Sequence, residues 1–139
     1  MKRLHLHIKV QDLKASQLFY SAMLGNEPTV IEEDYIKWKL DDPVVNFAIS
    51  LASESEKIGL DHLGLQTDNN EELEQIHASL SQADITDKEE KNTNCCYANS
   101  DKYWSLDPSG IPWEAFHSLS EIRTYGEKKA SFSTVCCAQ

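Results

Sequence analysis

The chain has 139 residues, an apolar fraction of 40%, a formal net charge of -10 and an isoelectric point near 4.8. This length predicts a single domain, and the apolar fraction is sufficient for a hydrophobic core. The negative charge argues against nucleic-acid or anionic-membrane partners, which bind basic patches, and no apolar run reaches the ~20 residues of a membrane span. Because the N-terminus lacks the apolar segment of a signal peptide and the cysteines lack a framework spacing, we expect a cytoplasmic location.

The first half of the chain predicts a strand, a helix and three further strands. Residues 4–10 alternate between apolar and polar side chains, as in a strand with one apolar face. Asp12 is a candidate N-cap for a helix that runs to about Leu24 and ends at Gly25-Asn26. Short strands are predicted near 29–32, 35–40 and 46–51, with a turn at Asp42-Pro43 between the last two.

The second half repeats this plan. Residues 60–67 alternate again, and helical spacing follows from Leu73 to Leu80. Strands are predicted near 85–90, 96–99, 103–106 and 113–117, with a turn at 107–110 before the last. We therefore expect an α+β domain over residues 1–120, built of two βαβββ modules (about 1–55 and 56–120). Residues 121–139 are polar, lack periodicity and are expected to form a flexible tail.

The repeat places two histidines at equivalent positions. A shift of 57 residues superposes His62 on His5, Leu63 on Leu6 and Leu65 on Ile8. Repeated modules usually pack about a pseudo-two-fold axis, so the first strands of the two halves are expected in one shared sheet. His5 and His62 would then face each other across a common cavity.

A carboxylate completes a candidate metal site. Glu114 lies on an apolar segment between Trp113 and Phe116, where an unpaired charge would be costly to bury. Two histidines and one carboxylate on one face of a metal form the facial triad of non-haem Fe(II) oxygenases. His7 shares a face with His5 and is an alternative first ligand.

The remaining histidines and the acidic run have ordinary structural explanations. His77 fits a partly buried helix stripe, and His117 alternates away from Glu114 and is not expected to be a ligand. The acidic run 32–34 is expected to be a solvated face.

All four cysteines occur in adjacent pairs, Cys95-Cys96 and Cys136-Cys137. A disulfide between neighbouring residues is strained and closes no useful loop, whereas two neighbouring thiolates can bind one thiophilic ion. The pattern therefore predicts contact with a soft metal or metalloid. The second pair is a possible accessory group that delivers the ion, supplies a third thiolate or scavenges.

The repeated module and the turn at 107–110 resemble the vicinal-oxygen-chelate superfamily, which contains glyoxalases, bleomycin-resistance proteins and extradiol dioxygenases. The segment 92–104, Asn-Thr-Asn-Cys-Cys-Tyr-Ala-Asn-Ser-Asp-Lys-Tyr-Trp, and the terminal cysteine pair resemble the arsenic- and cadmium-induced branch. That branch holds organoarsenical carbon–arsenic lyases and cadmium-induced proteins. The resemblance covers residues 1–120 and the tail.

The resemblance implies a sheet cupped around a metal. It implies Fe(II) held by His5, His62 and Glu114, although other divalent metals could occupy the purified protein. It also implies that Cys95 and Cys96 bind the trivalent arsenic of the substrate. The expected activity is an Fe(II)-dependent dioxygenase that uses O2 to cleave the carbon–arsenic bond of trivalent organoarsenicals. Candidate wall or accessory residues are Tyr97, Lys102, Tyr103 and Trp104.

Two rival functions are also open. The first is a non-catalytic stress protein that sequesters cadmium or arsenite through its cysteine pairs, a role that an acidic charge would favour. The second is another chemistry of the superfamily, such as isomerisation or thiol transfer, which has no need of adjacent cysteines. The sequence is compatible with a monomer or a homodimer.

Overall fold

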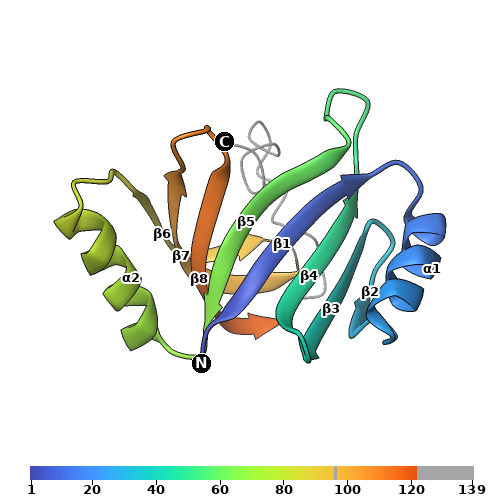
Figure 1. Cartoon of the computed structure of the whole chain (residues 1–139), viewed down its shortest axis with the longest axis horizontal. Helices are drawn as coiled ribbons and strands as arrows, with labels where there is room; N and C mark the ends of the chain where they lie inside the picture. The colour runs from blue at the N-terminus through green and yellow to red at the C-terminus, as the bar shows by residue number, and fades with distance from the viewer. Residues whose placement is uncertain (96, 122–139) are drawn as a thin grey trace.

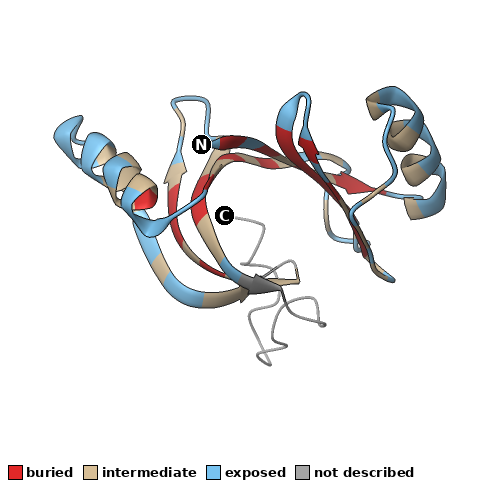
Figure 2. Ribbon diagram, turned by 90° about the horizontal axis from the view of Figure 1, so that it is seen from below, coloured by how far each residue is buried: buried red, intermediate tan, exposed pale blue. Residues whose placement is uncertain are grey.

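The computed structural model describes residues 1–95 and 97–121, and these form one arched sheet with two helices on its outer side (Figures 1 and 2). The first module comprises β1 (Arg3–Val10), α1 (Leu13–Leu24), β2 (Val30–Ile31), β3 (Tyr35–Asp41) and β4 (Val44–Leu51). The second comprises β5 (Gly59–Thr67), α2 (Asn70–Gln82), β6 (Lys88–Cys95), β7 (Ala98–Leu106) and β8 (Pro112–Glu121). The predicted βαβββ repeat is confirmed.

The strand order is β2-β3-β4-β1-β5-β8-β7-β6, so the first strands of the two modules lie side by side at the centre. β1 runs antiparallel to β5, whereas β1 pairs with β4 and β5 with β8 in parallel. This is the symmetric arrangement expected of two repeated modules. Neither α1 nor α2 is long and apolar enough to cross a membrane.

The helix ends follow from local side-chain chemistry. Asp12 accepts a hydrogen bond from the backbone N–H of Ala15 at 2.9 Å, which caps α1 as predicted. Gly25 ends the helix with a φ of +65°, a conformation that glycine adopts without steric cost. Asn69 caps α2 by accepting from the N–H of Glu72.

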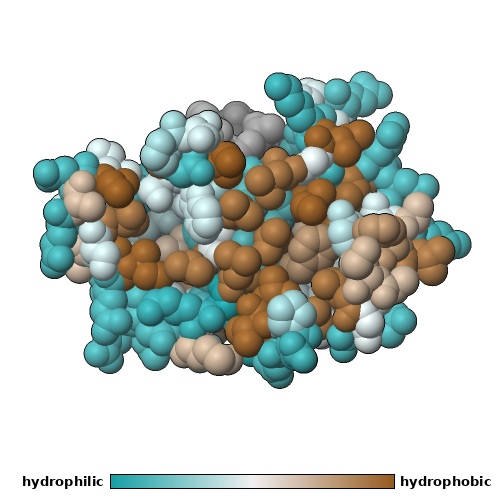
Figure 3. All heavy atoms as spheres, in the orientation of Figure 1, coloured by the Kyte–Doolittle hydropathy of each residue, from teal (hydrophilic) through white to brown (hydrophobic). Residues whose placement is uncertain are grey.

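The apolar core lies on the outer side of the sheet. Under α1 it is formed by the outward-facing residues of β3 and β4, with Trp38 and Ile49 fully buried. Under α2 the smaller cluster centres on Leu73 and Tyr103. Between the helices the outer face stays partly open, and Figure 3 shows hydrophobic residues spread over this face around β1 and β5. Leu4 and Leu60 are two of its exposed members.

The polar face of β1 is more deeply buried than its apolar face. His5, His7 and Lys9 are buried because they point into the concavity of the arch, whereas Leu6 and Ile8 are only partly covered. In a simple half-buried strand the apolar side chains are buried and the polar ones are exposed to solvent. In β1 the polar side chains are the more deeply buried. The site is therefore built on the concave face.

Several strand boundaries differ from prediction. Residues 98–106, which include parts of the two segments predicted as separate strands at 96–99 and 103–106, form one strand, β7, and β6 continues to Cys95. The polar residues Ser100 and Lys102, which lie between these two segments, are buried within β7.

Candidate metal centre

His5 and His62 meet at the centre of the sheet. His5 lies on β1 and His62 on β5, and their Nε2 atoms are 3.0 Å apart. Both side chains are almost completely buried. The antiparallel pairing of the two strands brings these positions together, because both side chains point into the cup.

The other ring nitrogens of both histidines contact oxygen acceptors. Nδ1 of His5 lies 3.0 Å from the backbone oxygen of Asn46, and Nδ1 of His62 lies 2.7 Å from Oδ2 of Asp61. Each Nδ1 therefore donates a hydrogen bond to its oxygen acceptor, and in a neutral ring of this tautomer the lone pair is on Nε2. An oxygen partner on the far side of the ring is the usual support of a metal-binding histidine.

A β-bulge places Asp61 beside His62. The register between β1 and β5 shifts at this point, since His7 pairs with His62 and Ile8 with Leu60, which leaves Asp61 without an opposite residue. In a regular strand, neighbouring side chains point to opposite faces, and Asp61 would point away from the ring. This partner of His62 was not predicted, because nothing in the alternating pattern of residues 60–67 marks the bulge.

Glu114 brings a carboxylate to the two imidazoles. Its Oε2 lies 3.3 Å from Nε2 of His62 and 3.7 Å from Nε2 of His5. Its other oxygen, Oε1, accepts a hydrogen bond of 2.6 Å from Nζ of Lys102, which is buried on β7. Burial favours the neutral acid, but Lys102, His62 and His5 together hold the pKa of Glu114 well below its usual range. The carboxylate is therefore ionised.

Gly64 allows Glu114 to approach. Gly64 is the register partner of Glu114 between β5 and β8, and a Cβ at this glycine would lie 2.1 Å from the backbone oxygen of Glu114. An isolated glycine inside a predicted strand is a sequence signal of such close approach. Gly64 was nevertheless not among the predicted site residues.

Two imidazole nitrogens and one carboxylate oxygen thus converge at one point. Burial, together with the neighbouring His62, lowers the pKa of His5 to about 3, so this ring is neutral near pH 7. Two imidazole lone pairs and one carboxylate oxygen repel one another unless a cation lies between them. Donors at right angles around a first-row metal, each about 2.1 Å from it, are about 3.0 Å apart. The observed separations of 3.0, 3.3 and 3.7 Å fit a divalent metal.

His7 offers a looser alternative. One ligand atom from each of His5, His7 and His62 can be chosen so that all lie within 4.8 Å of one another. Nε2 of His7 is hydrogen-bonded to Oγ of Ser50 at 2.8 Å, and its Nδ1 has no hydrogen-bond partner among the described residues. The set with Glu114 is tighter and supplies a negative charge. It is therefore the better match to a divalent cation.

Two of the candidate metal ligands, His5 and Glu114, line a small cavity of about 40 Å³ inside the cup. Its walls include His5, Glu114, Lys102, Tyr35 and Ala98. This volume is about that of one water molecule, so it suits an ion with a small ligand and not an aromatic molecule. A larger substrate would have to bind at the mouth.

The predicted wall residues Trp104 and Tyr103 lie on opposite faces of the sheet. Trp104 is buried on the inner side, with its ring 5.1 Å from that of His62. Tyr103 points the opposite way, toward α2, where its hydroxyl lies within hydrogen-bonding distance of Glu74 and Glu89. His77 is partly buried there, as expected, and stacks on Tyr103 at 4.3 Å.

His117 lies apart from the metal candidates, and its Nδ1 is 3.4 Å from the backbone oxygen of Thr67. Of the four cysteines, the structure describes only Cys95. The structure describes Cys95 only as the last residue of β6, paired with Ala98 of β7. Cys96, Cys136 and Cys137 lie outside the described residues. Ala98 itself lines the metal cavity, so the backbone end of β6 lies near the rim of the cup.

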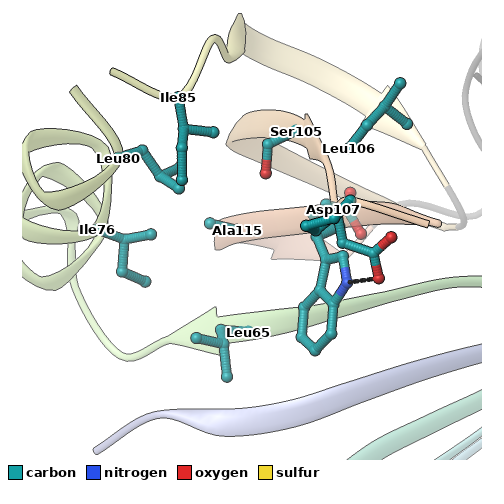
Figure 4. A pocket seen from close by; sticks show the side chains of 11 residues that line it. Leu65, Ile76, Leu80, Ile85, Ser105, Leu106, Asp107 and Ala115 are labelled. Carbon is teal, nitrogen blue, oxygen red and sulfur yellow. Dashed lines mark hydrogen bonds between the residues drawn. The ribbon is translucent and has the colours of Figure 1, made fainter. Parts of the chain in front are cut away.

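A larger apolar cavity of about 450 Å³ lies on the outer side of the sheet (Figure 4). Ile76 and Leu80 of α2 and Leu65 of β5 form its walls, and Nε1 of Trp113 donates to Oδ2 of Asp107 at its edge. It is a gap in the packing of α2 against the sheet. None of the histidines discussed above lines it.

Comparison with known families agrees with this architecture. Residues 2–115 match the family model described as the Glyoxalase/Bleomycin resistance protein/Dioxygenase superfamily, and the chain belongs to this superfamily. The chain is 35% identical over 138 residues to a "Trivalent organoarsenical cleaving enzyme" of Bacillus sp. (strain MD1), covering 99% of this chain and 83% of the relative. It is 30% identical over 126 residues to the "Cadmium-induced protein CadI" of Mycobacterium bovis, covering 91% and 82% of the two chains.

Solved structures share the fold at lower identity. An extradiol ring-cleaving dioxygenase from B. fuscum superposes with a TM-score of 0.63 and 19% identity, over 86% of this chain and 33% of that one. A Mn(II)-bound glyoxalase from Novosphingobium aromaticivorans gives 0.61 and 18%, over 91% and 44%. At these identities the likeness establishes the glyoxalase-like fold.

Proposed function

We propose that this protein cleaves the carbon–arsenic bond of trivalent organoarsenicals at an Fe(II) centre held by His5, His62 and Glu114. The observation that carries the proposal is the convergence of two imidazole nitrogens and one ionised carboxylate within 3.0–3.7 Å. The relative from Bacillus sp. named as a trivalent organoarsenical cleaving enzyme, at 35% identity, supports the substrate class.

The donor set favours iron. Two neutral nitrogens and one carboxylate on one side of the ion form the facial arrangement of non-haem Fe(II) oxygenases. Bound there, Fe(II) would supply the coordination positions and the redox chemistry for reaction with O2. Nickel, copper and zinc generally bind nitrogen and oxygen donors more tightly than Fe(II) does, so protein purified in air could carry one of them.

Neighbouring groups of the protein would hold the three ligands in position for the metal ion. Asn46 and Asp61 fix the two rings so that each Nε2 points inward. Lys102 binds one oxygen of Glu114 and leaves the other for the ion. Burial of the whole group limits access of water, and limited access strengthens each electrostatic interaction.

The substrate would be captured by the central cysteine pair. We propose that Cys95 and Cys96 bind the arsenic through sulfur, since trivalent arsenic is a soft centre and thiolates are soft donors. The cavity beside His5 is too small for an aromatic arsenical, so the arsenic would be held at the rim and only its carbon directed inward. Such positioning can supply a large part of a rate enhancement.

The overall reaction balances without another reductant. Methylarsenite, CH3As(OH)2, and O2 together give formaldehyde and arsenite, As(OH)3. The methyl carbon is oxidised, O2 takes up the electrons, and arsenic leaves in the trivalent state. Cys136 and Cys137 have the proposed accessory role of passing arsenic to the central pair.

The test is turnover by the anaerobically loaded protein. Fe(II) is added without air, then methylarsenite, then air, and arsenite and formaldehyde are measured. We expect both products in equal amounts from the wild type and from His77→Ala, which alters a histidine outside the cup. We expect neither from His62→Ala or Cys95→Ser. No arsenite above the Cys95→Ser level in the wild type would refute the enzymatic proposal.

A second candidate is metal sequestration without catalysis, favoured by the 30% identity to the cadmium-induced protein. It predicts tight cadmium binding that needs the cysteines and tolerates His62→Ala. The enzymatic proposal predicts instead that His62→Ala abolishes turnover while arsenical binding survives. Measuring cadmium binding and arsenite release on the same variants separates the two.

A further inference from the structure

A contact joins the β6–β7 hairpin of the second module to the first module. Tyr97 lies at the tip of the β6–β7 hairpin in the second module, and its hydroxyl donates a hydrogen bond of 2.6 Å to Oδ1 of Asp34. Asp34 directly precedes β3 of the first module. The acidic run 32–34 was expected to be only a solvated face, but its last residue is partly buried and bonded.

The aromatic ring of Tyr97 strengthens this contact. It packs on the ring of Tyr35, with centroids 5.5 Å apart, and Tyr35 is buried. Tyr35 lines the metal cavity and lies 6.0 Å, ring to ring, from His7. The hairpin tip is therefore tied to residues that form the wall of the candidate centre.

The backbone conformation of Tyr97 is costly to adopt. Tyr97 has a φ of +62°, a region that bulky side chains rarely occupy. Such a conformation persists only where surrounding contacts hold it, and here the hydroxyl and the ring each provide one. Burial and the nearby Asp34 raise the pKa of the Tyr97 hydroxyl, which keeps its proton available for the bond.

We propose that Asp34 and Tyr97 are positioning residues that orient the hairpin tip, and with it the cysteine pair, relative to the metal site. The inference rests on the proposed function and specifies how the thiols are placed. Tyr97 follows the pair directly in sequence, and Ala98, the partner of Cys95, lines the cavity. A hydrogen bond at Tyr97 therefore fixes the segment that presents arsenic to the iron.

The two residues are predicted to act on turnover more than on capture. The cysteines are neighbours, so both thiolates can bind one arsenic wherever the tip lies. Losing the contact would misplace the bound carbon–arsenic bond, and misplacements of about 1 Å can cost on the order of 100-fold in rate. We expect Tyr97→Phe and Asp34→Ala each to lower kcat at least tenfold.

The experiment compares these variants with Asp34→Asn and Glu33→Gln. Asp34→Asn keeps an oxygen acceptor and should retain most of kcat. Glu33→Gln removes a charge from the exposed neighbouring residue and should behave as wild type. Binding of methylarsenite is measured anaerobically without metal, and Fe(II) binding separately. Both should stay within about twofold of wild type.

The kcat of a double variant tests whether the two residues act through the same contact. Because Asp34 and Tyr97 form one contact, the double variant Asp34→Ala/Tyr97→Phe should lose no more kcat than the worse single variant. Wild-type kcat in both single variants, or losses that multiply in the double variant, would overturn the proposal. Parallel loss of kcat, arsenical binding and Fe(II) binding would also overturn it, because it would indicate general destabilisation.

Amide hydrogen exchange separates this inference from the proposed function. In Tyr97→Phe, exchange at the 95–98 turn should be faster than in wild type, whether or not the protein releases arsenite. If the wild type gives no arsenite but the turn still loosens, the function fails while the contact stands. If exchange does not change, the contact does not hold the tip and the inference fails.

Discussion

Gly64 and Glu114 face each other across β5 and β8 at a separation that admits no side chain. The Cβ of an alanine at 64 would lie 2.1 Å from the backbone oxygen of Glu114, and backbone atoms cannot turn aside. We predict that Gly64→Ala destabilises the protein by about 3 kcal/mol and weakens metal binding, since β8 must shift. Urea unfolding and Fe(II) binding measure the two effects.

Gly110→Ala is the comparison for that variant. Gly110 has a φ of +79° and open space around its missing Cβ, so its substitution should cost only about 1–2 kcal/mol of backbone strain and leave metal binding unchanged. Equal effects of the two substitutions would mean that close approach at Gly64 does not build the site.

Asp61→Asn should weaken metal binding without removing a metal ligand. The carboxylate of Asp61 accepts from Nδ1 of His62 and increases the electron density of that ring. Partners of this kind are typically worth about 10–100-fold in metal affinity. Competition titration with a coloured chelator gives the affinity. Glu71→Gln, which removes an exposed charge on α2, serves as control, and an affinity equal to that control would contradict the assigned role.

Lys102→Met should make folding depend on the metal. Lys102 and Glu114 form a buried ion pair at 2.6 Å, and removing one partner of such a pair commonly costs about 3–5 kcal/mol. A divalent ion can replace the lost positive charge, so added Fe(II) or Zn(II) should restore more stability to this variant than to wild type. Thermal unfolding with and without metal tests this, and an equal gain in both proteins would contradict it.

His77 provides a test of pH dependence away from the centre. Its Nδ1 lies 2.7 Å from Oδ2 of Asp87, and this contact raises the pKa of His77 above 6.5. A raised histidine pKa means that the stabilisation is fully present below pH 6.5 and is lost as the pH rises through the folded pKa. NMR titration should show this shift, and Asp87→Asn should reduce it, since Glu74 and Glu89 also raise the pKa of His77. An unchanged titration in Asp87→Asn would contradict the pairing.

Much of the site was accessible from the sequence because it follows the repeat. The 57-residue shift between His5 and His62 predicted their meeting, since equivalent strands of repeated modules pair at the centre of the sheet. Alternation correctly put His7 on the same face. The helix cap at Asp12 was also predictable, because capping depends on neighbouring residues only.

The rest depended on tertiary geometry. The bulge that brings Asp61 beside His62 is a pairing defect between two strands, and a single strand carries no record of it. Lys102 was predicted only as a wall or accessory residue, because its contact with Glu114 joins two different strands, β7 and β8. The contact of Asp34 with Tyr97 joins residues 63 positions apart, beyond the reach of local patterns.

The most direct test of the account is the stoichiometry and ligand set of bound iron. Anaerobic titration of the metal-free protein with Fe(II), followed by X-ray absorption, should give one iron per chain with two imidazole nitrogens and a carboxylate. His5→Ala, His62→Ala and Glu114→Ala should each abolish tight binding, whereas His117→Ala should not. Full iron occupancy in all three variants, or a first shell made of sulfur alone, would contradict the account.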